Sequence, residues 1–200
     1  MQIARYTAPT TPGGGSSFIA GRPKTAGGVV LPGVPGLDVL SLGTNALSNN
    51  TIYYAPFIAQ APFSFDQFQL EISTAGGAGS TVGAALYSAD SDLLPTTLLL
   101  DGGTVATDTT GPKTLPVTSG TLAAGRYVLA VLPALGATFR AYRGGQGLAG
   151  LNPVLGTGSL VAFITASRTA SLGFPSTAVA PAPTYSNQTF SYFALMRFSY

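Results

Sequence analysis

Glycine and proline interrupt this chain so often that long helices are disfavoured throughout. The 200 residues include 26 Gly and 15 Pro. Proline removes a backbone donor, and glycine destabilises the interior of a helix. No segment between these residues shows an apolar stripe of helical period. The pattern that remains, short strands separated by Gly/Pro turns, predicts an all-β protein.

Two strands are the clearest. Within residues 65–73, apolar Phe68, Leu70 and Ile72 alternate with polar residues, which is the period of a strand with one exposed face. Residues 126–132 (RYVLAVL) form an apolar run, as in a strand inside a sandwich. Further strands are expected at residues 81–88, 98–105, 113–117 and 190–200, and long loops at 144–158 and 171–187. This succession predicts a jelly-roll-like β-sandwich.

The first fifty residues differ from the rest in being especially rich in Gly and Pro. Such density prevents helix and interrupts sheet ladders. We therefore predict an extended N-terminal arm over residues 1–50, followed by the β-sandwich domain over residues 51–200. An arm of this kind clamps a neighbouring subunit, and the alternative is an arm folded back on its own domain. The contacts of the arm are expected at Phe18, Ile19, Val29, Val30 and Leu31.

The residue types that carry most enzyme chemistry are missing or sparse. The chain has no His, no Cys and no Trp, and 8% of its residues are charged. Histidine and cysteine supply most general bases, metal ligands and thiol nucleophiles. No pair among the seven Asp/Glu stands out as suited to glycoside hydrolysis. We therefore predict a protein that is not an enzyme, with no catalytic residue and no cofactor.

Three motifs invite a ligand-binding interpretation. Residues 145–150 match G-x-G-x-x-G, but Pro153 follows closely and no acidic residue occurs after Asp108, so a plain glycine-rich loop is expected. Residues 76–81 lack the lysine of a phosphate loop and predict a hairpin turn. Asp90 and Asp92, with Asp101, leave calcium open, although Asp is equally an ordinary turn residue.

The low charge also bears on partners. The net charge is +2, so little repulsion keeps copies apart, and we expect sister subunits or partners to cover much of the surface. The basic residues are scattered, which excludes a nucleic-acid partner. The most apolar stretch, residues 127–137, is interrupted by Pro133 and is too short to span a bilayer of ~30 Å. No signal peptide opens the sequence, so we predict no membrane association.

Three segments carry a resemblance to a known group of proteins. They are residues 82–90 (VGAALYSAD), 98–105 (LLLDGGTV) and 122–130 (LAAGRYVLA). They resemble β-sandwich domains of tailed-phage virion proteins, including head decoration, head fibre and tail fibre proteins. The resemblance covers about residues 63–132, and Val128 stands where those domains often carry Trp.

This resemblance implies a virion structural protein, of the capsid decoration or fibre type, assembled in the host cytoplasm. Its partners would be copies of itself, as a homotrimer, and other virion proteins such as major capsid or tail proteins. We expect the subunits to pack through Phe193, Leu195 and Phe198. The alternative is a receptor- or carbohydrate-binding module of a tail fibre tip. Its site would lie in loops at Tyr142, Gln146, Asn152 and Tyr185.

Overall fold

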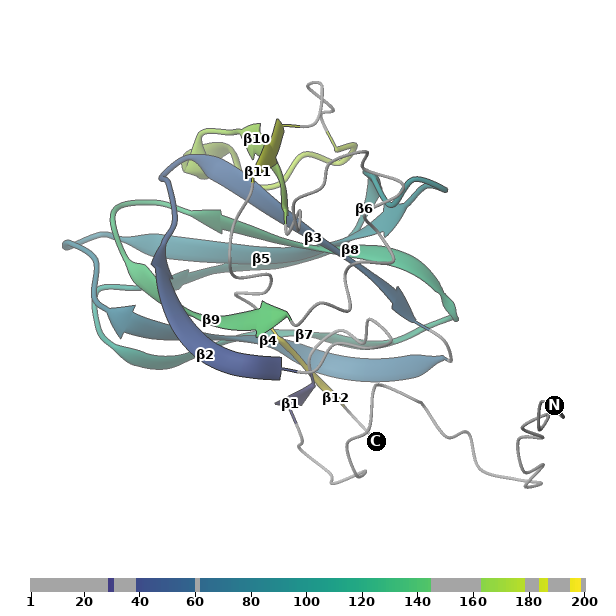
Figure 1. Cartoon of the computed structure of the whole chain (residues 1–200), viewed down its shortest axis with the longest axis horizontal. Helices are drawn as coiled ribbons and strands as arrows, with labels where there is room; N and C mark the ends of the chain where they lie inside the picture. Colours follow the sequence, from purple (N-terminus) through teal and green to yellow (C-terminus); the bar gives the residue numbers. More distant parts are fainter. Residues whose placement is uncertain are drawn as a thin grey trace, which may run out of the picture.

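The computed structural model of the chain describes residues 29–30, 39–59, 62–144, 163–178, 184–186 and 195–198. Within these residues, two antiparallel six-stranded sheets form two layers (Figure 1). The strands are β1 (Val29–Val30), β2 (Val39–Ala46), β3 (Thr51–Ala59), β4 (Phe63–Thr74), β5 (Thr81–Ala89), β6 (Pro95–Ala106), β7 (Gly111–Leu122), β8 (Gly125–Pro133), β9 (Thr138–Gly144), β10 (Phe163–Ser167), β11 (Thr184–Ser186) and β12 (Leu195–Phe198). A short 3-10 helix, Ala170–Leu172, follows β10. The all-β prediction is confirmed.

Strands β2 to β9 are connected as a jelly roll. Sheet A contains the path β2–β9–β4–β7, and sheet B contains the path β3–β8–β5–β6. Successive strands alternate between the sheets except for the hairpin of β5 and β6, so each sheet joins strands that are distant in sequence. Eight strands in two sheets with these Greek-key connections make a jelly roll. The predicted sandwich type is therefore confirmed.

Strand β2 lies within the range predicted to be arm. It pairs with β9, from Val39 opposite Gly144 to Ala46 opposite Thr138, and is the first strand of the jelly roll. The sandwich therefore begins at or before Val39, and not at residue 51. The last proline of the segment is Pro35, so the Gly/Pro-rich composition ends just before the strand begins. Residues 1–28 and 31–38 of the predicted arm lie outside the described residues.

The main core lies between the two sheets. On β4, Phe68, Leu70 and Ile72 are buried as their alternation predicted. Opposite β12, strand β4 carries one extra residue between Phe65 and Gln67, and Phe65 lies on the same side of the sheet as Phe68. The rings of Phe65 and Phe68 lie 5.5 Å apart, and both are almost fully buried. The bulge thus adds an aromatic side chain to the core that strict alternation would have placed outside.

Sheet B is buried on both of its faces. On β8, Leu129 and Val131 face the main core, whereas Val128 and Ala130 face a second core on the outer side. Phe174 covers this second core, and the backbone of residues 176–178 is bonded to β6. The continuous apolar run over residues 126–132 therefore reflects a strand covered on both sides, as predicted.

Two short strands, β10 and β11, lie where the sequence analysis expects no strand. Strand β11 lies inside the loop expected over residues 171–187, and β10 lies between the two expected loops. These strands extend sheet B beyond β3, in the order β11–β10–β3. Each is only three to five residues long, so two-residue alternation has little length in which to appear.

Candidate functional site

Strand β4 is the element on which sheet A is built. One of its edges pairs with β7 along almost the whole strand. On the opposite edge, β9 pairs only with Ile72 and Thr74, while the other edge of β9 pairs with β2 from Thr138 to Gly144. The remainder of that edge, from Phe65 to Gln69, pairs with β12. We call this part of the β4 edge, Phe65 to Gln69, the terminal-strand slot.

Strand β12 fills the slot with four register pairs. They are Leu195 with Gln69, Met196 with Phe68, Arg197 with Gln67, and Phe198 with Phe65. A register shift separates the last two pairs and coincides with the bulge of β4. Backbone N–H and C=O groups inside a sheet need partners, and β12 provides them for this stretch of β4.

Strand β1 pairs with the far side of β12. Val29 lies opposite Arg197 and Val30 opposite Met196, and Figure 1 shows β1 (purple) beside β12 (yellow). Two sets of contact residues expected at opposite ends of the chain therefore meet in one sheet, since Leu195 and Phe198 belong to β12. At β1 the predicted arm lies against its own domain, which is the alternative that the sequence left open. Four other residues of these sets lie outside the described residues: Phe18, Ile19, Leu31 and Phe193.

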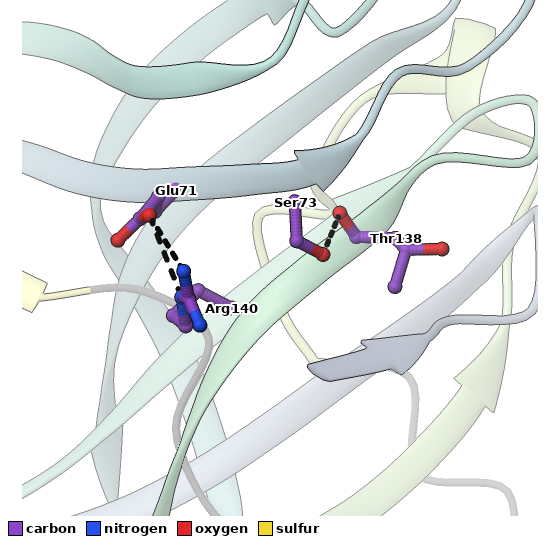
Figure 2. Close-up of polar contacts among 4 residues, drawn as sticks. All are labelled: Glu71, Ser73, Thr138 and Arg140. Carbon is purple, nitrogen blue, oxygen red and sulfur yellow. Dashed lines mark hydrogen bonds and ion pairs between the residues drawn. The ribbon is translucent and has the colours of Figure 1, made fainter. Parts of the chain in front are cut away.

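Polar side chains join β4 to β9 at the point where the two strands diverge (Figure 2). Glu71 accepts a hydrogen bond from Arg140, with 3.3 Å between Oε1 and Nη2, and Ser73 Oγ donates to the carbonyl of Thr138 at 3.1 Å. The side chains of Arg140 and Glu71 are 35% and 41% exposed. An ion pair so exposed contributes about 0–1 kcal/mol. The carboxylate of Glu71 thus links β4 to β9 beside the terminal-strand slot.

Two of the aspartates considered for calcium bond to the nearby backbone, Asp90 in a turn and Asp101 within β6. Asp90 Oδ1 accepts hydrogen bonds from the amides of Asp92 and Leu94, both at 2.9 Å. Asp101 Oδ1 accepts one from the amide of Gly103 at 2.8 Å. These are the local bonds by which Asp stabilises a turn. Within the described part of the chain, no three His, Cys, Asp or Glu side chains gather into a group suited to a metal ion.

The glycine-rich segments have different outcomes. Residues 76–79 form a turn, in which the amide of Ser80 donates to the carbonyl of Gly77 at 3.0 Å. This turn leads from β4 in sheet A to β5 in sheet B, so it connects the two layers and is not the hairpin that the sequence predicted. The G-x-G-x-x-G segment, residues 145–150, lies outside the described residues.

The residues expected for a glycan loop are not brought to one pair of strands. Tyr142 lies on β9 in sheet A, opposite Leu42, and Tyr185 lies on β11 in sheet B, opposite Ile164. Gln146 and Asn152 lie outside the described residues. The carbohydrate site therefore stays a prediction.

Several tyrosines that could have stacked on sugars belong to the cores. Tyr54 and Tyr87 are at most 1% exposed, and their rings meet edge to face at 5.5 Å. Tyr87 Oη donates to the carbonyl of Pro175 at 2.8 Å. Burial raises the pKa of Tyr54 to about 12 and also raises the pKa of Tyr87. Tyr53 and Tyr127 are likewise buried, in the main core.

Comparison with known proteins does not place the chain in a family. No protein-family model and no curated protein matches the chain. Among solved structures, a clostridial cysteine protease, Cwp84, after propeptide cleavage, is similar over 60% of this chain at 14% identity and a TM-score of 0.40. The chain spans 29% of that protein. The chain itself contains no cysteine. In the described part of the chain, no helix has the length and apolarity needed to cross a membrane.

Proposed function

We propose that this chain is a structural protein of a tailed-phage virion, a capsid decoration or fibre-type component that self-associates and is anchored by its N-terminal arm. The observation that carries the proposal is the position of the three segments resembling such proteins. Residues 82–90, 98–105 and 122–130 fall on β5, β6 and β8, which are adjacent in sheet B in the order β8–β5–β6. The resemblance thus describes one continuous piece of the sandwich.

The use of the charged side chains supports a role without catalysis. Glu71 pairs with Arg140 across two strands, Asp90 stabilises a turn, and Asp101 bonds to the backbone of Gly103 within β6. These carboxylates hold the backbone in place. Jelly rolls serve in viral capsid and lectin domains, and a fold alone does not decide between such uses. The low charge of the chain favours the first use, because it suits a surface covered by other subunits.

The edge strands of the two sheets differ in how readily each could pair with another subunit. Strand β7 carries Pro112 and Pro116, which have no amide hydrogen to offer a further strand. The pairing of β5 with β6 contains three register shifts, and β6 also carries Asp101. Prolines, bulges and charges are the devices that keep edge strands from pairing with other molecules. Association through β1 and β12, the strands of sheet A nearest the two ends of the chain, is therefore favoured over association through β6 or β7.

Deletion of residues 1–28 tests the anchoring role. This cut removes most of the predicted arm and keeps β1 and β2, which belong to the sheet. Virions whose gene for this chain has been deleted would be mixed with the purified full chain or with the truncated chain, and then sedimented. We expect the full chain to sediment with the virions and the truncated chain to stay in solution, with unchanged circular dichroism. The matched control is Leu135→Ser, which removes an exposed leucine from the β8–β9 turn and should sediment like the parent.

Equal sedimentation of the truncated and full chains would show that the arm is not the anchor. If neither chain joins the virions, and the full chain binds host glycans as a monomer, the recognition alternative replaces the structural one.

A further inference from the structure

We infer that β12 is exchanged between copies of this chain, so that the terminal-strand slot of one copy is filled by β12 of another. The inference deepens the proposed function by naming the surface through which copies associate, and it rests on the self-association proposed there. The occupant is defined by the structure itself, because β12 is the strand that pairs with Phe65 to Gln69 of β4.

The first argument is that β12, the strand that fills the slot, does not belong to the jelly roll. Strands β2 to β9 complete their eight-stranded connection without β12. They nevertheless leave a stretch of β4 in the middle of sheet A that needs a further strand, because β9 departs after Ile72. An interior edge of this kind has to be paired, whichever copy provides the strand.

The second argument is that β12 is held by few bonds. It contributes four residues, and a register shift interrupts their pairing with β4. Its other neighbour, β1, has two residues and pairs within the described residues only with β12. A segment held so briefly opens more readily than the long ladders around it, such as the pairing of β4 with β7.

The third argument concerns the connection that leads into β12. The preceding strand, β11, belongs to sheet B, whereas β12 belongs to sheet A, and residues 187–194 join them. Exchange keeps every contact of β12 with β4 and changes only which copy the connection comes from. For this reason domain swapping costs little free energy. If each copy gives its β12 to the next copy around a ring, the result is a closed oligomer, which can be the expected trimer.

Cysteine crosslinking tests the exchange directly, because the chain has no native cysteine. Gln69 and Leu195 are register partners across the slot. The single variants Gln69→Cys and Leu195→Cys would be made separately, one with a heavy-isotope label, unfolded together, refolded and oxidised. Exchange predicts a disulfide-linked dimer containing one labelled and one unlabelled chain. The pair Gln67→Cys and Arg197→Cys repeats the test in case one variant fails to fold.

The matched control uses a pair within the jelly roll. Ser64 on β4 and Thr121 on β7 are register partners whose hydroxyl oxygens lie 2.8 Å apart. Mixed Ser64→Cys and Thr121→Cys chains should give only background dimers. Because the slot holds its two thiols together, the mixed dimer across the slot should exceed this background by about tenfold or more.

The outcomes separate this inference from the proposed function. A mixed dimer at background level, with the double variant Gln69→Cys/Leu195→Cys crosslinking only as a monomer, overturns the exchange. If the unmodified chain is nevertheless an oligomer by native mass, association uses another surface and the proposed function stands. A chain that stays monomeric in both measurements overturns the exchange and the self-association together.

Discussion

Substitution of Gly102 by alanine tests the packing of the two sheets. Gly102 lies on β6 in sheet B, and its missing side chain leaves room for a ring from sheet A. A Cβ atom placed on Gly102 would lie 2.7 Å from Cδ2 of Phe68 and 2.9 Å from the carbonyl oxygen of Ala84. Phe68 is fully buried, and the carbonyl group of Ala84 is part of the backbone of the neighbouring strand β5. Neither can move without disturbing the core or the ladder.

The expected cost follows from two opposing effects. Overpacking a well-filled core destabilises a protein by about 1–3 kcal/mol. Replacing glycine by alanine also reduces the entropy of the unfolded chain, which offsets about 0.4–1 kcal/mol of that cost. Because the contacts with Phe68 and Ala84 are both shorter than 3 Å, the overpacking cost lies in the upper part of its range, and we expect Gly102→Ala to lower the free energy of unfolding by about 2 kcal/mol. For a chain of this length, that lowers Tm by about 4–8 °C.

The assay is thermal and urea unfolding followed by circular dichroism, with Gly77→Ala as the matched control. Gly77 is exposed in the turn after β4, and a Cβ there would meet nothing within 4 Å. The control should change the free energy of unfolding by less than about 0.5 kcal/mol. If Gly102→Ala is as stable as the control, β6 does not pack over β4 as described, and the inter-sheet core is wrongly placed.

Three further predictions concern the second core, on the outer side of sheet B, and the ion pair between Glu71 and Arg140. Tyr54 and Tyr87 stay protonated in the folded chain at a pH where the unfolded chain releases their protons, because burial raises both pKa values, that of Tyr54 to about 12. Stability should thus be unaffected by these groups below about pH 9 and fall as the pH rises above 10, in urea unfolding read at stepped pH; a constant stability up to pH 12 contradicts their burial. Phe174→Ala should lower the free energy of unfolding by about 3 kcal/mol, since Phe174 is 9% exposed over sheet B, and a loss below about 1 kcal/mol would mean that this face is not covered. A double-mutant cycle of Glu71→Gln with Arg140→Gln should give a coupling of about 1 kcal/mol or less that disappears in high salt, whereas a larger, salt-independent coupling would refute the exposed ion pair.

Strands with a local signal could be predicted from the sequence. The two-residue spacing of Phe68, Leu70 and Ile72 predicts β4. The continuous apolar run over residues 126–132 predicts β8. Strand β7 is longer than the predicted residues 113–117, because Pro112 and Pro116 are tolerated on an edge strand. The predicted range already included Pro116, and the strand also continues through Pro112, which lies just before that range.

The pairing of β1 with β12 and of β12 with β4 could be predicted only in part. Val29, Val30, Leu195 and Phe198 were singled out by apolar character, which is a local property. That these residues meet on neighbouring strands depends on pairing between the two ends of the chain, and no local pattern specifies such pairing. The bulge of β4 at residue 66 could not be predicted either, because it depends on how β12, from the other end of the chain, aligns with that strand.

The claim that this chain acts as a self-associating structural protein is tested most directly by its native mass in solution. In native mass spectrometry of the full chain over a range of concentrations, we expect one discrete homo-oligomer. A trimer would have three times the 20.2 kDa mass of the chain. A species of 20.2 kDa at every concentration would contradict self-association, and with it the role of the terminal strands.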